Sequence, residues 1–197
     1  MRSAPIPIPP ESTGPVSTQR FHCMGPAEFK VVFAEWQQKI SRTLSSSKAP
    51  WAIVGIKRRG AVLARRLCAM FQGEGSSVLH HGEIDISLYR DDYHLRSSKP
   101  MVLGSEITFR VEGLNILLVD DVLFSGRTVR AALDLILDFG RPRQISLAVF
   151  IDRGYRELPI AANVVGREIA TEPGDQVLVT LEELGETDGV DLLRKNP

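Results

Sequence analysis

Apolar residues along this chain alternate between helical spacing and short continuous runs. Phe29, Val32, Phe33, Trp36 and Ile40 recur at the spacing of one helix face, which begins near a proline and ends at a run of serines. Further helices are predicted over 61–72 and 128–139, and buried strands over 51–56, 115–119, 145–151, 164–165 and 177–179. This order predicts an α/β domain with a mostly parallel central sheet flanked by helices.

Three stretches differ from that pattern. Between residues 82 and 89, apolar and polar residues alternate with a period of two, which predicts a half-buried strand. Residues 91–114 show little periodicity and are interpreted as a long functional loop that can contain a hairpin. The first twenty residues hold five of the twelve prolines, so we expect a disordered or extended tail over 1–20 and one domain over 21–197.

Composition narrows the classes of function. The chain has 197 residues, 43% of them hydrophobic, which suits one domain with a buried core. Its 24 basic and 24 acidic residues cancel, so bulk charge does not hold it on nucleic acid, which leaves only a local basic patch. No apolar run approaches the roughly 20 residues that span a bilayer. With no signal pattern and only two cysteines, we expect a cytoplasmic protein without membrane contact.

The segment with the clearest chemistry is ILLVDDVLFSGRT, at residues 116–128. An apolar strand ends in two carboxylates, Asp120 and Asp121, and a short loop with a glycine and two hydroxyls then enters a helix. Ligands of open parallel sheets bind beyond the carboxyl ends of the strands. The N-terminus of a helix favours a phosphate, and ionised carboxylates accept hydrogen bonds from sugar hydroxyls. The segment therefore predicts a sugar-phosphate site; the alternative is an acidic strand end followed by an ordinary helix cap.

These residues resemble the phosphoribosyl pyrophosphate (PRPP) motif of type I phosphoribosyltransferases. The chain has neither the Gly-Lys-Ser/Thr of a Walker A loop nor the GxGxxG of a dinucleotide fold. Three more segments are similar to counterparts in the pyrimidine-operon attenuator/uracil phosphoribosyltransferase family: IVGIKRRG at 53–60, GEIDISLYRDD at 82–92 and GRPRQISLAVFIDRGYRELP at 140–159. The resemblance extends over about residues 51–180 and implies the type I phosphoribosyltransferase fold with a mobile hood loop.

The resemblance implies a reaction in which uracil and PRPP give UMP and pyrophosphate in the presence of Mg²⁺. Asp120 and Asp121 would be catalytic residues that hold the ribose hydroxyls and, indirectly, the metal ion. The PRPP loop would also comprise Val122, Leu123, Phe124, Ser125, Gly126, Arg127 and Thr128, with the last four at the 5′-phosphate. Because C1 of the ribose passes through a cationic state, the protein need supply only positioning and charge stabilisation.

Two basic segments would meet the pyrophosphate. Lys57, Arg58, Arg59 and Gly60 match the pyrophosphate loop of the family, for which the alternative is a solvated surface turn. Arg90 stands where the hood loop begins and would be a third catalytic residue that binds pyrophosphate; the alternative is a surface salt bridge. Closure of such a loop excludes water from a reactive cation and limits hydrolysis.

The base pocket is expected just after the strand at 145–151. Asp152 would bind a metal-bound water, and the backbone near Arg153 would read the uracil edge; the alternative is a structural pair between these two side chains. Phe124 occupies the position at which 6-oxopurine salvage enzymes place a third acid, and an aromatic ring accepts no proton. Uracil is therefore the expected base, and a phosphoribosyltransferase for another base is the alternative.

The family implies a second function, RNA-binding attenuation of a pyrimidine operon with weak or no catalysis. The candidate contacts to an mRNA leader are Arg141, Arg143, Arg156 and Arg167. The first helix carries few cations, and the YRELPIA segment lacks a His and an Arg common in the family, which argues against this function. The resemblance also implies a homodimer or a larger homo-oligomer.

Overall fold

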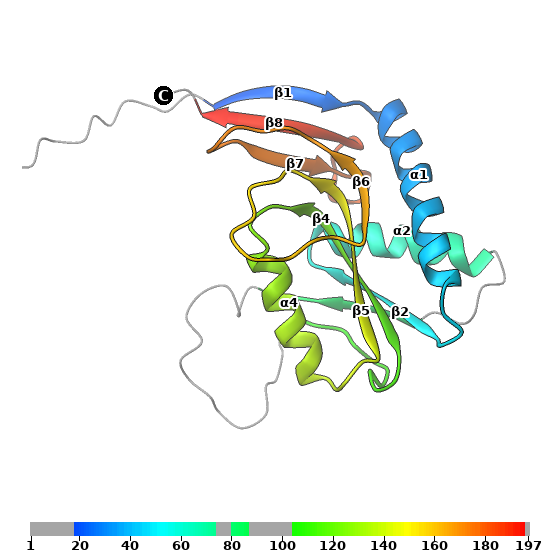
Figure 1. Ribbon diagram of the computed structural model, residues 1–197. Coiled ribbons are helices and arrows are strands. Elements are labelled where there is room, and N and C mark those ends of the chain that lie inside the picture. The colour runs from blue at the N-terminus through cyan, green and yellow to red at the C-terminus, as the bar shows by residue number, and fades with distance from the viewer. Residues whose placement is uncertain (1–17, 74–79, 87–103, 196–197) are drawn as a thin grey trace, which may run out of the picture.

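The computed structural model describes residues 18–73, 80–86 and 104–195 (Figure 1). Its main body is a parallel sheet of five strands in the order β3-β2-β4-β5-β6. These strands are β2 (Trp51–Ile56), β3 (His80–Ile84), β4 (Asn115–Leu123), β5 (Gln144–Asp152) and β6 (Val164–Glu168). The α-helices in the described ranges are α1 (Pro26–Ser45), α2 (Arg59–Gly73) and α4 (Arg127–Asp138). The predicted α/β fold with a mostly parallel sheet flanked by helices is confirmed.

The central strands are largely buried because helices cover both faces of the sheet. All six residues of β2 and the first six of β4 are buried. One core cluster joins α1 and α2 to one face, and a second joins α4 to the other, as Figure 1 shows. Alternate residues of β4 divide between the two clusters, with Leu117 and Val119 in the first and Ile116 and Leu118 in the second.

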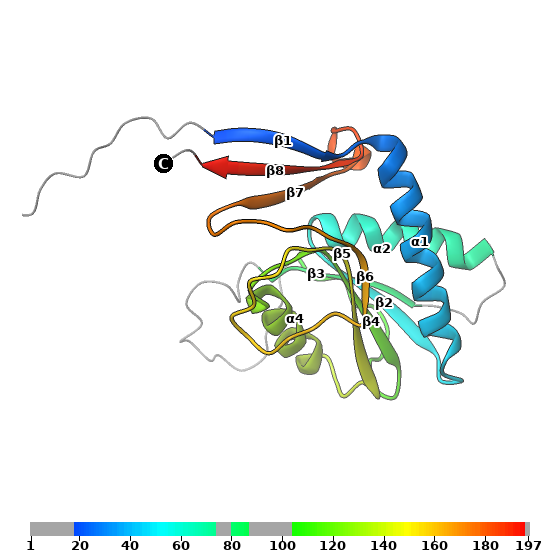
Figure 2. The ribbon, with the colours of Figure 1, turned by 45° about the horizontal axis from the view of Figure 1, so that its top comes forward.

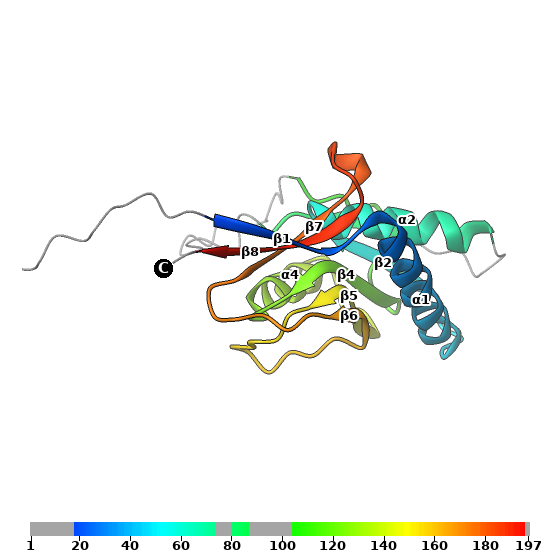
Figure 3. The same ribbon diagram turned by 90° about the horizontal axis from the view of Figure 1, so that it is seen from above.

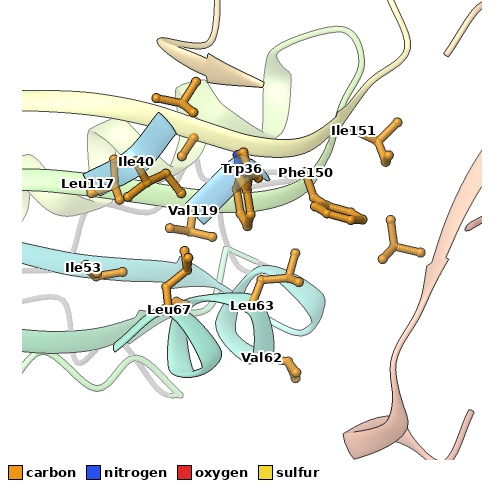
Figure 4. Packing of buried hydrophobic residues seen from close by; sticks show 14 of the residues in the cluster. Trp36, Ile40, Ile53, Val62, Leu63, Leu67, Leu117, Val119, Phe150 and Ile151 are labelled. Carbon is orange, nitrogen blue, oxygen red and sulfur yellow. The ribbon is translucent and has the colours of Figure 1, made fainter. Parts of the chain in front are cut away.

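The first cluster contains a group of aromatic rings beneath α1 (Figure 4). The ring of Phe150 in β5 lies 4.6 Å from that of Phe29 and 5.5 Å from that of Trp36, measured between centroids. All three residues are at most 1% exposed. The apolar helix face predicted from the sequence is thus confirmed, and its large side chains pack α1 against the sheet.

Phe150→Ala is expected to lower the free energy of unfolding by about 3–5 kcal/mol, because it leaves a cavity between α1 and the sheet. Urea unfolding followed by circular dichroism measures the change. Leu137→Ala is the control, since Leu137 is 55% exposed and its truncation is expected to cost only about 0.5 kcal/mol. Losses of similar size in the two variants would contradict this assignment of the core.

A smaller antiparallel sheet, in the order β1-β8-β7, lies above the carboxyl end of β4 (Figures 1 and 2). It comprises β1 (Thr18–Met24), β7 (Gln176–Thr180) and β8 (Gly189–Lys195), and the short 3₁₀ helix η1 (Glu182–Leu184) precedes β8. Figure 3 shows the smaller sheet from above, and its strand β7 is in contact with β4. Arg59 links the two sheets, because its Nε donates a hydrogen bond of 2.5 Å to the carbonyl of Val179 in β7.

The smaller sheet corrects the predicted domain boundary. The predicted tail reaches residue 20, but Thr18–Met24 pairs with β8, so the last three tail residues belong to a strand. Six of the seven residues of β1 are exposed. The strand therefore lacks the alternation of buried apolar and exposed polar residues from which a strand can be predicted. Backbone pairing and hydrogen bonds from Arg20 and His22 to Asp191 hold β1 instead. Residues 1–17 of the predicted tail lie outside the described residues.

The strand predicted over 82–89 begins and ends earlier, at His80–Ile84, because these residues pair with β2. Residues 87–103, which include most of the predicted hood loop, lie outside the described residues. The remainder of the predicted 91–114 loop returns to β3, where Glu83 and Glu106 exchange two backbone hydrogen bonds in an antiparallel bridge.

An ion pair joins β8 to the loop that precedes β7. Arg194 donates two hydrogen bonds to the Asp175 carboxylate, at 2.8 and 2.9 Å, and these lower the pKa of Asp175 to about 2. The pKa of an unfolded aspartate is about 3.9, so the pair stabilises the fold above that pH and its contribution is lost as the pH falls toward 2.

Arg194→Gln therefore tests this pair through the pH dependence of stability. The wild type is expected to be more stable than the variant above about pH 4. The difference is expected to shrink as the pH falls through 2 and to vanish only below that pH, where the carboxyl is protonated in both states. Thermal unfolding of both proteins across this range measures it. A difference that does not change with pH would contradict an electrostatic role for the pair.

Candidate active site

A cavity of about 640 Å³ lies at the carboxyl ends of β2 and β4. The parallel register brings these ends together, since Gly55 pairs with Val119 and each strand then leads into a polar segment. The cavity is lined by Ile56, Lys57, Arg58, Arg59, Asp85, Ile86, Asp120, Asp121, Val122 and Thr128. The structure thus brings the predicted basic turn and the predicted acidic pair to one cavity. Asp85 and Ile86 were not predicted there, because only the pairing of β3 beside β2 places them at this edge.

The two carboxylates stand at successive positions near the end of β4. Asp120 is 5% exposed, and its Oδ1 accepts a hydrogen bond of 2.9 Å from the backbone N–H of Asp121. Burial raises the pKa of the Asp121 carboxyl, and a hydrogen bond with Asp120 and the positive charge of Arg59 oppose that shift. Carboxylate oxygens on the wall of a cavity are suited to accept hydrogen bonds from neighbouring hydroxyls.

The turn after β4 leads directly into the N-terminus of α4. Gly126 precedes the helix with φ of 90°, a left-handed conformation in which a side chain would be strained. Ser125 Oγ accepts a hydrogen bond of 3.4 Å from the backbone N–H of Arg127. A second cavity, of about 600 Å³, is lined by the whole loop from Val122 to Thr128. The first turn of a helix carries N–H groups without helical partners, so this loop is suited to an anion.

Leu123 is the member of this loop whose side chain cannot serve a ligand. It is 1% exposed and packs in the core cluster under α4. Its predicted part in PRPP binding is therefore limited to the main chain.

The basic turn after β2 packs against the end of β4. Lys57 Nζ donates hydrogen bonds to the carbonyl of Gly104 at 2.6 Å and to the carboxylate of Glu106 at 3.3 Å. The peptide bond between Lys57 and Arg58 is cis. A Cβ atom on Gly60 would lie 2.6 Å from the carbonyl oxygen of Val119, so only glycine allows this approach. Arg58 is exposed and Gly60 is buried, so the segment is partly packed, and Lys57, Arg58 and Arg59 line the cavity. Its contact with pyrophosphate stays a prediction.

Asp152 pairs with Arg156, four residues later. Its Oδ2 accepts a hydrogen bond from Arg156 Nη2, and its Oδ1 accepts one of 2.9 Å from the backbone N–H of Gly154. The predicted alternative, a pair between Asp152 and Arg153, is wrong because the two side chains leave the end of β5 in different directions and find different partners. The carboxylate is 17% exposed, so most of its surface serves these contacts.

Arg153 lies buried beneath the ring of Phe124. Its guanidinium carbon is 4.1 Å from the ring centroid, and Nη1 donates to the carbonyl of Asp175. Its backbone N–H donates a hydrogen bond of 3.1 Å to the carbonyl of Leu123. Beside this stack is a cavity of about 310 Å³, lined by Phe124, Arg153, Tyr155, Arg156, Glu157, Pro173 and Gly174. Pro173 and Gly174 belong to no motif, and only the path of the chain between β6 and β7 brings them here.

Comparison of the chain with known proteins shows the family to which it belongs. The family model of the phosphoribosyl transferase domain matches residues 26–179. The bifunctional protein PyrR of Chloroflexus aurantiacus is 50% identical over 139 residues, which cover 71% of this chain and 75% of that protein. The chain belongs to the phosphoribosyltransferase family, in its PyrR-like branch. The bifunctional protein PyrR of Roseiflexus sp. (strain RS-1) is likewise 48% identical over 144 residues, with 73% and 79% covered.

Solved structures of phosphoribosyltransferases share the fold. The hypoxanthine-guanine enzyme of Leishmania tarentolae, in complex with GMP, aligns with a TM-score of 0.66 at 15% identity, over 89% of this chain and 97% of that one. The hypoxanthine phosphoribosyltransferase of Staphylococcus aureus aligns with a TM-score of 0.62 at 16% identity, over 87% and 90%. The predicted type I phosphoribosyltransferase fold is confirmed.

The arginines predicted to contact RNA do not form one patch in this phosphoribosyltransferase. Arg141 and Arg143 are exposed just before β5 begins, whereas Arg167 pairs with Ile151 near the other end of that strand. Ile151 is eight residues beyond Arg143, a separation of about 26 Å at roughly 3.3 Å per residue. Arg156 is turned inward, so the predicted patch is corrected to separate exposed arginines at opposite ends of the neighbouring strands β5 and β6.

Arg90, predicted at the pyrophosphate, falls within residues 87–103, outside the described residues of this phosphoribosyltransferase. Its contact with pyrophosphate stays a prediction.

Proposed function

We propose that this phosphoribosyltransferase transfers the phosphoribosyl group of PRPP to uracil, giving UMP and pyrophosphate. A bond forms between C1 of the ribose and N1 of uracil, the bond from C1 to the pyrophosphate oxygen breaks, and the N1 proton passes to solvent. The observation that carries the proposal is the cavity shared by the Asp120–Asp121 pair, a third carboxylate at Asp85, three cationic side chains and the start of α4. The names of the PyrR relatives support the same proposal.

Each wall of the site would bind a different part of PRPP. Asp120 and Asp121 would accept hydrogen bonds from the 2′- and 3′-hydroxyls, and residues 125–128 would hold the 5′-phosphate. Lys57, Arg58 and Arg59 would stabilise the negative charge that develops on pyrophosphate as it departs. Since no covalent step on the protein is needed, the proposed rate enhancement comes from positioning and from these charges.

The residues of the cavity suit a magnesium ion that arrives with PRPP. Mg²⁺ prefers oxygen ligands and keeps several waters, and the carboxylates of Asp120 and Asp121 offer oxygens on the cavity wall. Within the ranges that the structure describes, no group of three or more His, Cys, Asp or Glu could hold a metal ion by itself. We therefore assign its remaining ligands to PRPP and water. The bound ion would neutralise charge on the pyrophosphate.

The choice of uracil rests on Phe124 and on the resemblance. Phe124 offers no proton acceptor to a purine ring, and one face of its own ring is covered by Arg153. Pyrophosphate release from PRPP with uracil, cytosine, orotate and hypoxanthine, side by side, tests this choice. We expect release with uracil at a rate well above that with the other three. A faster reaction with hypoxanthine or orotate would support the alternative, a phosphoribosyltransferase for another base.

RNA-binding attenuation is the second candidate, and the word bifunctional in the names of the relatives favours it. Phosphate contacts need clustered cations, and the four candidate arginines are separated or turned inward. A gel-shift assay with the leader RNA upstream of the chain's own gene, with and without UMP, tests it. We expect no shift at moderate salt, together with UMP formation. A shift that depends on Arg141 and Arg143 would restore the attenuator function.

Two further expectations accompany the proposal. No helix in the described part of the chain is long and apolar enough to cross a membrane, and a cytoplasmic location stays a prediction. A homodimer or larger homo-oligomer, implied by the resemblance, is tested by light scattering after size-exclusion chromatography.

A further inference from the structure

The guanidinium of Arg156 joins two loops of the site. Its Nη1 donates hydrogen bonds to the carbonyls of Phe124 and Gly154, at 2.8 and 3.1 Å, and its Nη2 donates to the carboxylate of Asp152. Its Nε donates to the carbonyl of Ile160 at 3.0 Å. The side chain is only 24% exposed. Arg156, which was predicted to contact RNA, thus points into the protein, where its guanidinium N–H groups donate hydrogen bonds to protein acceptors.

The chain that carries Arg156 also forms the support of the phosphate loop. The carbonyl of Ser125 accepts hydrogen bonds from the N–H groups of both Glu157 and Leu158, each at 3.0 Å. Gly126 approaches Ile160 so closely that a Cβ on the glycine would lie 3.3 Å from the isoleucine side chain. The position of the phosphate loop therefore depends on residues 156–160.

We infer that Arg156 is a positioning residue, which sets the phosphate loop relative to the loop that follows β5. It holds the first through the Phe124 carbonyl and the second through Asp152 and Gly154. The inference rests on the proposed function and adds a residue that touches neither substrate. The phosphate loop places the ribose and the loop after β5 borders the base, so the distance between the reacting C1 and N1 atoms depends on both. Errors of about 1 Å in such a distance cost about 100-fold in rate.

Arg156→Lys tests the inference because it keeps the charge and removes the planar fork, and a lysine cannot reach all of these acceptors from one position. We expect kcat per active site to fall at least tenfold, because the reacting atoms are misplaced. The dissociation constant for PRPP with Mg²⁺, measured by calorimetry, is expected to rise about tenfold, and the KM for uracil to rise as well. Arg42→Gln is the control, since Arg42 is exposed in the last turn of α1 and belongs to no predicted site. It is expected to leave all three values unchanged.

A merely structural role predicts a different result. It would lower the melting temperature and the fraction of active protein, and would leave kcat per active site, the PRPP dissociation constant and the uracil KM within twofold of the wild type. That outcome would overturn the inference. Guanidinium ion at millimolar concentration is expected to restore PRPP affinity to Arg156→Ala and to leave the wild type unaffected; the absence of any restoration would also count against it.

The same titrations separate this inference from the proposed function. If the wild type binds no PRPP, the proposed function fails and the inference falls with it. If the wild type binds PRPP and releases no pyrophosphate with uracil, only the assigned base is wrong, and the change in PRPP affinity of Arg156→Lys still decides the role of Arg156.

Discussion

Asp120→Asn and Asp121→Asn are each expected to reduce kcat/KM for UMP formation by about 100-fold or more. An amide keeps the shape of the carboxylate, but it loses the negative charge and one acceptor oxygen. Hydrogen bonds to the ribose hydroxyls and stabilisation of positive charge at C1 are lost together. A 100-fold loss corresponds to about 2.7 kcal/mol of transition-state stabilisation.

The fold is expected to survive both substitutions, which makes activity the informative measurement. Burial already disfavours the charged form of Asp121 and raises its pKa, so removal of its charge is expected to leave the melting temperature unchanged or higher. Glu35→Gln, on the exposed face of α1, is the control for loss of one carboxylate elsewhere. UMP formation is measured by chromatography. Turnover within about threefold of the wild type in both variants would exclude the acidic pair as the ribose site.

Gly60→Ala is expected to weaken PRPP binding by about 100-fold and to lower the free energy of unfolding by about 1–3 kcal/mol. The added Cβ would lie 2.6 Å from the carbonyl oxygen of Val119 and 3.0 Å from the Cα of Asp120. Both are backbone atoms at the end of β4, so the basic turn must move away from the cavity. The cations that face the pyrophosphate and the carboxylates that face the ribose would then be displaced relative to one another.

Gly113→Ala is the matched control for this substitution. Gly113 has φ of 75° and no atom within 4 Å of an added Cβ, so alanine there is strained without a collision. It is expected to cost about 1–2 kcal/mol of stability and to leave PRPP affinity intact. Urea unfolding and calorimetry with PRPP and Mg²⁺ measure both effects. Equal PRPP affinities for the two variants would show that the close approach of Gly60 is unimportant for the site.

The central sheet was predictable because burial on both faces produces continuous apolar runs. The run at 115–119, for example, is the first part of β4, and the two carboxylates after it stand at the edge where ligands of parallel sheets bind. The smaller sheet was not predictable in this way. Six of the seven residues of β1 are exposed, and β8 contains a buried aspartate, Asp191, where a strand pattern would have an apolar residue.

The sequence also does not show in which direction the side chains that follow each strand point. Arg153 and Arg156 both stand in the polar segment after β5, and spacing does not show that one is buried beneath Phe124 while the other joins two loops. Their acceptors are mostly backbone carbonyls, such as those of Phe124, Gly154 and Asp175, which carry no sequence signal. The sequence therefore predicted Arg156 on an RNA-binding surface, whereas the structure shows that its donors bind groups within the protein.

A crystal structure with PRPP and Mg²⁺ bound tests the central claim most directly. The account predicts the ribose hydroxyls within hydrogen-bond distance of Asp120 and Asp121, the 5′-phosphate on residues 125–128, and the pyrophosphate beside Arg58 and Arg59. PRPP bound elsewhere on the protein, or absent from this cavity at saturating concentration, would contradict it.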